Sequence, residues 1–491
     1  VLPPALRSAL RLDQLLERIC PGRRQRHLLD QLMAAPASGE DRDERSALWR
    51  DMRRHPDLAD LVRRLEGRVA EIHTMGERER DRDLLKLVWR LGDLSLLVES
   101  VELLAGVLVP LQEQLESRRL QELARLLAAA DSDATLRRLR RELPQLQEGL
   151  RERRSVTVGV NLDDRLRPRE AVLLSVNAEE FRRGGVLDTV GDALRGGTAA
   201  FRTRRKIHRN ADEPSGQAPL TPLFEELDAM LGELSRPLAQ VLKRYNGVQL
   251  GWLRRLVEEL GVVESLARFA DEMEAAGMPV CGAGETRETT DVVSATGLYD
   301  PLLVSAASPP VTNDVELFNG TSTMVVTGPN NGGKTTFLRA LGIAVLCDRS
   351  GLPVAAAGFA RGGVEQLAVS FAGGEAAHMG AGRFAHEAQQ IAMMLDETDG
   401  RTLVLLNETF SSTAGPDAVE LLAELTGVLA ERGARTVLAT HLHQVLDRVS
   451  AGSLTILPDK AFVLQRARPD GRSLAREVAR EAGLDFDRYR P

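Results

Sequence analysis

The chain of 491 residues is poor in aromatic side chains and in cysteines. Aromatic residues make up 4% of it, which argues against an extended platform for stacking single-stranded nucleic acid or sugars. The three cysteines are far apart and fit neither a disulfide framework nor a zinc cluster, so a reducing cytoplasm is the expected compartment. The first ten residues carry Arg7 and no long apolar run follows them, so we do not expect a secretory segment. Residues 94–111 are apolar but carry Glu99 and Glu102, so we do not expect a membrane span.

Charge and composition set the next limits. The net charge of −7 argues against a uniformly basic coat, although a local basic patch is still compatible with it. A hydrophobic content of 43% is sufficient for large cores, and the length predicts about two to four domains.

The first part of the chain, residues 1–290, is predicted to be mainly α-helical. Leucines and other apolar residues recur at a three-four spacing in residues 84–94 and again in residues 223–234, which is typical of a buried helix face. The arginine-rich run at 137–141 fits the solvated face of a long helix. Alternating residues at 155–162 and 170–177 predict an antiparallel hairpin inserted among the helices.

From about residue 291, apolar runs alternate with helical segments. The runs at 323–327, 403–406, 436–440 and 461–465 are short and bounded by turn residues. Helical segments separate the first three, and a further helix is predicted at 472–482. This order predicts an α/β domain with a mostly parallel sheet covered by helices.

A phosphate-binding loop follows the first of these predicted strands. Residues 328–335 fit the pattern G-x-x-x-x-G-K-[ST] and open an apolar helix, which is the context that the motif requires. Glycines let successive N–H groups face phosphate oxygens, the lysine adds a full charge, and the threonine hydroxyl faces magnesium. The predicted ATP-binding residues are Gly328, Pro329, Asn330, Asn331, Gly332, Gly333, Lys334, Thr335 and Thr336.

Two further strands end in polar residues suited to hydrolysis. The strand at 403–406 ends in Asn407 and Glu408. We expect Thr335 and Asn407 to organise Mg²⁺ and Glu408 to accept a proton from water. An aspartate is more usual at position 407, so we expect weaker metal binding and slow turnover. His441, at the end of the next strand, is predicted to sense the γ-phosphate.

The residues of the second half resemble the MutS family of DNA mismatch-repair ATPases. The similarity rests on the runs at 327–356, 407–418 and 439–445, with a weaker likeness to a dimer-forming helical segment at 471–484. It implies an ABC-type ATPase domain at 291–491 with C-terminal dimerisation helices. It also implies a helical core or lever at 1–290 with a reduced, clamp-like insertion near 155–215.

The resemblance assigns further residues to a dimeric ATPase. The loop that would complete the partner's nucleotide site corresponds to Gly380, Gly382 and Arg383, although a glycine-rich surface loop is the alternative interpretation. Asp417 corresponds to the family's D-loop aspartate. In this family a Phe-x-Glu wedge in the N-terminal domain inserts beside mispaired bases. The first phenylalanine of this sequence is Phe181, so we expect a short homologue that lacks the N-terminal mismatch-recognition domains.

A dense basic run is the candidate DNA contact. We expect the hairpin and this run to grip the phosphate backbone without reading base sequence, and a solvated loop is the alternative. The residues of the run that we assign to DNA are Arg202, Arg204, Arg205, Lys206 and Arg209.

These observations predict a homodimeric, cytoplasmic, nucleoid-associated ATPase that uses ATP and Mg²⁺. Binding and hydrolysis of ATP would gate a clamp on double-stranded or branched DNA in repair or recombination control, together with other repair factors. Two alternatives are a nucleotide-gated scaffold that does not hydrolyse ATP and a mechanical ABC-type ATPase that acts on protein partners.

Overall fold

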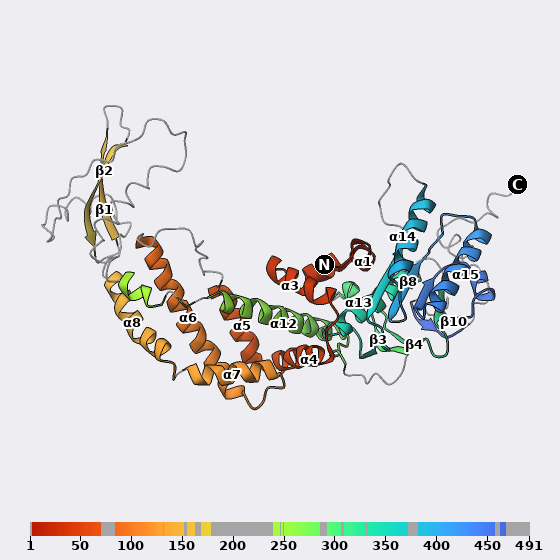
Figure 1. Cartoon of the computed structure of the whole chain (residues 1–491), viewed down its shortest axis with the longest axis horizontal. Helices are drawn as coiled ribbons and strands as arrows, with labels where there is room; N and C mark the ends of the chain where they lie inside the picture. Colours follow the sequence, from red (N-terminus) through yellow and green to blue (C-terminus); the bar gives the residue numbers. More distant parts are fainter. Residues whose placement is uncertain are drawn as a thin grey trace. The chain divides into compact units, whose positions relative to one another are not determined.

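A computed structural model (Figure 1) provides the coordinates of the chain. The structure describes residues 2–69, 84–130, 132–151, 155–162, 168–177, 239–245, 247–248, 250–284, 292–305, 309–328, 332–371, 382–456 and 462–467. The predicted helices at 223–234 and 472–482 lie outside these residues, and so does the whole basic run from Arg202 to Arg209.

The chain forms two compact units. The first, here called the sheet unit, comprises Val1–Arg63, Glu113–Glu122 and Glu258–Pro491. The second, the helical unit, comprises Arg64–Gln112 and Leu123–Val257. This grouping differs from the predicted boundary near residue 290, because helices from the start of the chain pack against the sheet. The division into a lever domain and an ATPase domain stays a prediction.

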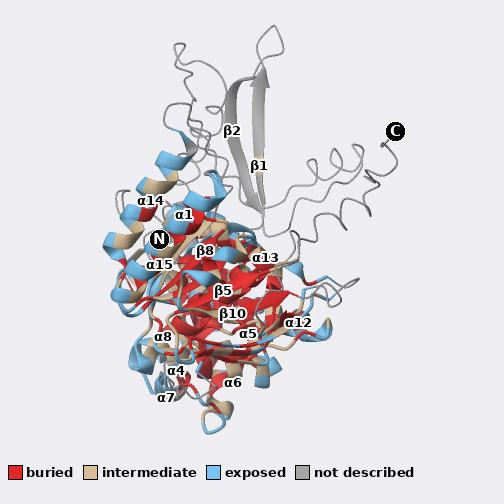
Figure 2. Cartoon of the chain, turned by 90° about the vertical axis from the view of Figure 1, so that its right-hand side faces the viewer, coloured by how far each residue is buried: buried red, intermediate tan, exposed pale blue. Residues whose placement is uncertain are grey.

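The sheet unit is built on a six-stranded sheet in the order β11-β10-β5-β9-β8-β7. All neighbouring pairs are parallel except the short edge strand β11, which runs antiparallel to β10. The strands are β5 (Thr323–Thr327), β7 (Gln366–Phe371), β8 (Thr402–Asn407), β9 (Arg435–Ala439), β10 (Gly452–Ile456) and β11 (Leu464–Gln465). Most of the strand residues are buried (Figure 2).

The mostly parallel sheet predicted from the sequence is therefore confirmed. Strands β5, β8 and β9 lie where they were predicted, whereas the run at 461–465 contributes only two strand residues. Strands β7 and β10 were not predicted. A second, antiparallel sheet of β4 (Asn313–Leu317), β3 (Val293–Leu298) and β6 (Gly358–Ala360) was also not predicted.

Helices cover both faces of the six-stranded sheet. Helix α13 (Lys334–Arg349) approaches Leu405 of β8, because a Cβ added at Gly342 would lie 3.1 Å from that leucine. The neighbouring strand residues Val404 and Leu406 instead join a core with α14 (Arg383–Glu397) and α15 (Gly415–Glu431). Successive strand side chains point to opposite faces, so α13 lies on one face and α14 and α15 lie on the other.

The N-terminal helices pack on α13 and on the sheet edge. Helix α1 contacts α13 and β7, and α3 also contacts α13. Leu10 and Leu12 are fully buried, which explains why this segment groups with the sheet. The helices of this part of the sheet unit are α1 (Pro4–Leu10), α2 (Leu12–Ile19), α3 (Arg23–Ala34), α4 (Gly39–Arg54) and the first part of α5 (Pro56–Val69).

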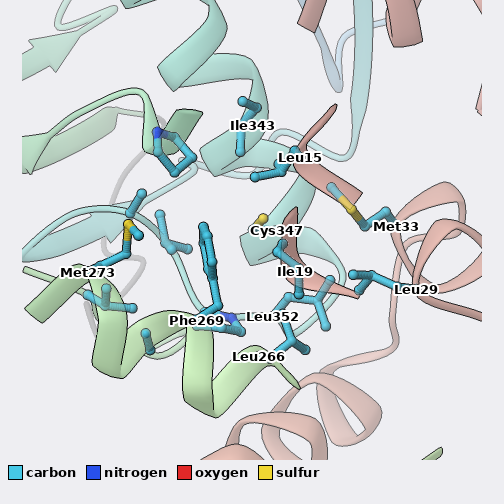
Figure 3. A pocket seen from close by; sticks show the side chains of 16 residues that line it. Leu15, Ile19, Leu29, Met33, Leu266, Phe269, Met273, Ile343, Cys347 and Leu352 are labelled. Carbon is cyan, nitrogen blue, oxygen red and sulfur yellow. The ribbon is translucent and has the colours of Figure 1, made fainter. Parts of the chain in front are cut away.

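A small apolar cavity of about 30 Å³ lies within the sheet unit (Figure 3). It is lined by side chains of α2, α3, α13 and α12 (Gly251–Ala275), among them Leu15, Phe269 and Cys347. Burial raises the pKa of the Cys347 thiol to about 12, so this thiol stays protonated and unreactive. No charged residue lines the cavity, and we interpret it as a packing gap.

The helical unit has a core of its own. Leu91 and Leu94 of α6 (Leu84–Leu111) pack with Leu139 of α8 (Ala134–Arg151) and with Tyr245. The buried face predicted around residues 84–94 is thus confirmed at its described positions. Helix α7 (Arg118–Ala130) spans both units in sequence.

Two further features of the helical unit bear on the sequence predictions. The predicted hairpin is present, with β1 (Ser155–Leu162) antiparallel to β2 (Pro168–Asn177). Within the described residues, one segment, Arg90–Leu111, is long and apolar enough to cross a membrane. Core helices of water-soluble proteins also meet this criterion.

Candidate nucleotide-binding site

Three neighbouring strands deliver the candidate site residues to one edge of the sheet. Strand β9 lies between β5 and β8, and the three are parallel. Their carboxyl ends therefore meet at the same edge. Gly328 follows β5, Asn407 and Glu408 end and follow β8, and His441 comes two residues after β9. These residues are brought together although more than a hundred positions separate the first from the last.

Two glycines shape the loop between β5 and α13. Gly328 has φ 143° and Gly333, the residue before the helix, has φ 98°. Residues other than glycine rarely adopt these backbone conformations. At Gly328 there is also no space, because a Cβ would lie 2.8 Å from Cβ of Ile456. Gly332 is described as well, and Thr336 lies in the first turn of α13, whereas Pro329, Asn330 and Asn331 lie outside the described residues.

Lys334 is the first residue of α13, and its side chain is only 6% exposed. Its Nζ donates to the Gly328 carbonyl at 3.0 Å and lies 3.8 Å from Oε1 of Glu408. Burial lowers the pKa of the Lys334 ammonium, and the nearby Glu408 carboxylate opposes this effect. The lysine therefore holds a poorly solvated charge at the amino end of a helix, where an anion is favoured.

Thr335 and Asn407 are in direct contact. The threonine hydroxyl donates to Oδ1 of Asn407 at 3.0 Å. Asn407 is buried and pairs in register with Phe371 of β7 and Ala439 of β9, so neighbours on both sides fix its backbone. The two residues predicted to organise a metal thus lie side by side, and both present neutral oxygens.

Glu408 connects the lysine to the histidine. Its N–H donates to the Ala439 carbonyl at 2.9 Å, and its backbone is left-handed, with φ 51°. Oε2 of its carboxylate lies 2.6 Å from Nδ1 of His441. The glutamate side chain is 24% exposed and that of His441 is 52% exposed, so both are within reach of water. The contact with His441 therefore fixes the orientation of the Glu408 carboxylate.

A divalent cation at this site would have few protein ligands. Thr335 Oγ1 and Asn407 Oδ1 are oxygen donors of the kind that Mg²⁺ accepts, and this ion is usually held by few protein groups together with substrate phosphates. Among the described residues, no group of three or more His, Cys, Asp or Glu side chains is arranged to bind a metal. The residues present therefore fit a cation that arrives with a nucleotide.

Helices α14 and α15 border the site. Gly382 precedes α14 and Arg383 is its first residue, whereas Gly380 lies outside the described residues. Oε1 of Glu387 accepts from the Phe410 N–H at 2.9 Å, which connects α14 to the chain just after Glu408. Asp417 is exposed in the first turn of α15.

One aromatic residue at the loop was not predicted. Phe462 is 49% exposed, and a Cβ at Gly333 would lie 3.0 Å from its ring. Asn313 positions this segment, because its Nδ2 donates to the Phe462 carbonyl and its Oδ1 accepts from the Leu464 N–H. The contact joins segments that are about 150 positions apart, and the only local signal was an aromatic residue in a chain that has few.

Comparison with known proteins shows which family these residues resemble. A family model, MutS domain V, matches residues 324–456, from β5 to the end of β10. An endonuclease MutS2 of Lactococcus lactis subsp. lactis (strain IL1403) is 30% identical over 184 residues, which are 35% of this chain and 24% of that protein.

Two further relatives match longer stretches of the chain. An endonuclease MutS2 of Streptococcus sanguinis (strain SK36) is 25% identical over 323 residues, covering 64% of this chain and 39% of that protein. A DNA mismatch repair protein MutS of Synechococcus sp. (strain CC9902) is 28% identical over 283 residues, covering 54% and 31%. The chain thus spans about a quarter to two fifths of the length of these curated relatives. The matched region contains the whole cluster around Lys334 and Asn407, so the part of the chain that holds the candidate site is similar to domain V of the MutS family.

Proposed function

We propose that the chain is an ATP-dependent DNA-binding protein with a P-loop ATPase of the ABC type. ATP binding and hydrolysis in a homodimer would gate its grip on DNA, in repair or recombination control at the nucleoid. The observation that carries this proposal is the cluster at the sheet edge. At the start of α13, Lys334 lies 3.8 Å from Glu408, whose carboxylate lies 2.6 Å from His441. The next residue of the helix, Thr335, donates to Asn407 at 3.0 Å.

Nucleotide binding is supported by the state of Lys334. Its ammonium is desolvated and lies 3.8 Å from Oε1 of Glu408. A triphosphate would supply a stronger anionic partner in a place where electrostatic interactions are little screened. The amides of Gly332 and Gly333 and the amino end of α13 would add donors for the phosphate oxygens.

Hydrolysis is supported by the pairing of Glu408 with His441. Glu408 would accept a proton from water as the water oxygen bonds to the γ-phosphorus and the bond to the β–γ bridging oxygen breaks, which releases ADP and phosphate. His441 would hold the carboxylate in position through Nδ1. A magnesium ion bound with the nucleotide would neutralise phosphate charge, held by Thr335 and Asn407.

Dimerisation is part of the proposal. Gly380, Gly382 and Arg383 would meet the nucleotide of a second copy, and Asp417, exposed at the start of α15, would lie near that interface. Residues 471–484 would hold the two copies together. The exposed position of α14 residues such as Phe384 and Met393, which are 39% and 68% exposed, is compatible with a covering partner.

DNA binding is supported by a basic surface on the helical unit, here called the α8 surface. It consists of Arg137, Arg138, Arg141, Lys243 and Arg244, all exposed. Arg138 and Arg244 share Glu142 as a partner. Within the described part of the chain, Arg137 and Arg141 donate to backbone carbonyls instead of carboxylates. Their charge is thus available to phosphates, and this surface would act together with Arg202, Arg204, Arg205, Lys206 and Arg209.

The proposal is tested with two substitutions at the cluster. Lys334→Ala removes the positive charge that would face the phosphates. It is expected to abolish nucleotide binding, which calorimetry measures. Glu408→Ala is expected to keep binding but lower phosphate release by about a hundredfold or more, because the proton acceptor is lost. In the same assays, the retention of duplex, mismatched and branched DNA with and without ATP measures the coupling.

Glu420→Ala is the matched control for Glu408, because Glu420 is exposed on α15. It should leave both measurements unchanged. Normal hydrolysis in the Lys334 and Glu408 variants would refute the assigned roles. DNA retention that is the same with and without ATP would refute the proposed gating.

A second function, a scaffold that binds ATP without hydrolysing it, is favoured by Asn407. The amide leaves the site without the acidic residue that usually organises the metal. Phosphate release by the wild-type protein with Mg²⁺ or Mn²⁺ separates the two functions, because only an enzyme turns over.

A further inference from the structure

We infer that Asn407 allows nucleotide to bind at this site without a divalent cation. The inference rests on the proposed binding of nucleotide and concerns which ionic form of the nucleotide the protein accepts. In P-loop sites Mg²⁺ is usually held between the phosphates, the loop Ser or Thr and an acidic side chain at a strand end. The cation there also separates the negative charges of the acid and the phosphates.

The first argument is the charge of the site. The cluster around Asn407 contains the Lys334 ammonium and the Glu408 carboxylate, 3.8 Å apart, with His441 beside the carboxylate. One positive and one negative group leave the site close to neutral. An aspartate at position 407 would add a second carboxylate next to Thr335, and a metal-free polyphosphate would then enter a site of its own sign.

The second argument is the hydrogen-bonding capacity of an amide. Oδ1 of Asn407 accepts the Thr335 hydroxyl at 3.0 Å. The same side chain also carries an NH₂ group with two donors, whereas a carboxylate carries none. An amide can therefore bond directly to a phosphate oxygen or to its water, where a carboxylate needs a cation as a bridge.

The third argument is that the amide is held in place. Asn407 is 6% exposed, and its backbone lies between Phe371 of β7 and Ala439 of β9. The paired strands fix its backbone, and the Thr335 hydroxyl holds its side chain at the loop. Its neutral side chain is thus a fixed property of the site.

The test compares nucleotide affinity in excess EDTA and in excess MgCl₂. Calorimetry of the wild-type chain with ADP and with a non-hydrolysable ATP analogue is expected to give dissociation constants within about threefold of each other, as expected for a nearly neutral site. In Asn407→Asp, EDTA is expected to weaken binding by about tenfold or more, with recovery in MgCl₂, because a like charge is added beside the phosphates.

Asn319→Asp is the matched control. Asn319 is exposed and donates to Glu316, so this substitution adds the same charge away from Lys334 and should leave the EDTA measurement unchanged. If Asn407→Asp does not fold, the wild-type comparison decides alone. Wild-type binding that requires MgCl₂ overturns this inference only, whereas no binding in either condition overturns the proposed function itself.

Discussion

At the scale of single residues, the site depends on a chain of contacts through Glu408. Its left-handed backbone, with φ 51°, costs free energy in a residue with a side chain, on the order of 1–3 kcal/mol. In return, one carboxylate faces both the Lys334 ammonium and His441. A conformation of this kind at the end of a buried strand is typical of functional positions.

The lowered pKa of Lys334 predicts how nucleotide affinity changes with pH. Binding needs the protonated ammonium, and burial lowers its pKa below the ordinary value of 10.5. Affinity should therefore fall as the pH rises through the lowered pKa, before it reaches 10.5. Titration of a fluorescent nucleotide at a series of alkaline pH values measures this change.

Lys334→Arg is the control for this titration, because a guanidinium keeps its proton throughout the range. Its affinity, even if weaker overall, should not depend on alkaline pH. A wild-type affinity that stays constant up to pH 10.5 would contradict the prediction.

At the scale of elements, α13 is the helix that joins the loop to the rest of the sheet unit. It begins at Lys334 and packs between the N-terminal helices and β8. At Gly342 the helix packs tightly against its neighbours, because an added Cβ would lie 2.8 Å from the side chain of Leu10 and 3.1 Å from that of Leu405. Both leucines are fully buried.

Gly342→Ala is accordingly expected to lower the free energy of unfolding by about 1–3 kcal/mol, because the added methyl group overpacks a full core. The matched control is Gly427→Ala in α15, where nothing lies within 4 Å of the added Cβ. That variant should gain about 0.5–1 kcal/mol from helix propensity. Urea unfolding measures both, and equal effects of the two variants would contradict the packing argument.

The elements also indicate how far the sequence alone could lead. Strands β5, β8 and β9 were predictable, because each is a short, mostly apolar run that is buried except at Arg435 of β9. Strand β7 is only half-buried, and β6 has three residues, so neither carries a clear pattern. The cluster around Lys334 followed from motifs, whereas Phe462 and Asn313 meet only through long-range folding, for which no local pattern exists.

At the scale of the whole molecule, the proposal joins nucleotide binding to a grip on DNA. The chain is acidic overall, with a net charge of −7. Affinity for DNA must therefore come from local surfaces such as the α8 surface, and it should depend strongly on salt.

Replacing Arg137 and Arg141 together by glutamine is expected to weaken duplex binding several-fold. It should also lower the slope of log affinity against log salt by about 1.8, because each phosphate contact contributes about 0.9. Fluorescence anisotropy at several salt concentrations provides the slope. Glu148→Gln, which removes a negative charge from the exposed side of the same helix, should strengthen binding, and an unchanged slope in the arginine variant would remove the α8 surface from the DNA contact.

The grouping of Val1–Arg63 with Glu258–Pro491 has a consequence for synthesis in the cell. The leucines of α1 and α2 leave the ribosome long before their partners, α13 and the sheet, have been translated. At about 5–20 residues per second, the roughly 300 residues between α2 and α13 take about 15–60 s. During this interval the nascent chain exposes apolar helices, so we expect its yield to depend on chaperones that bind growing polypeptides.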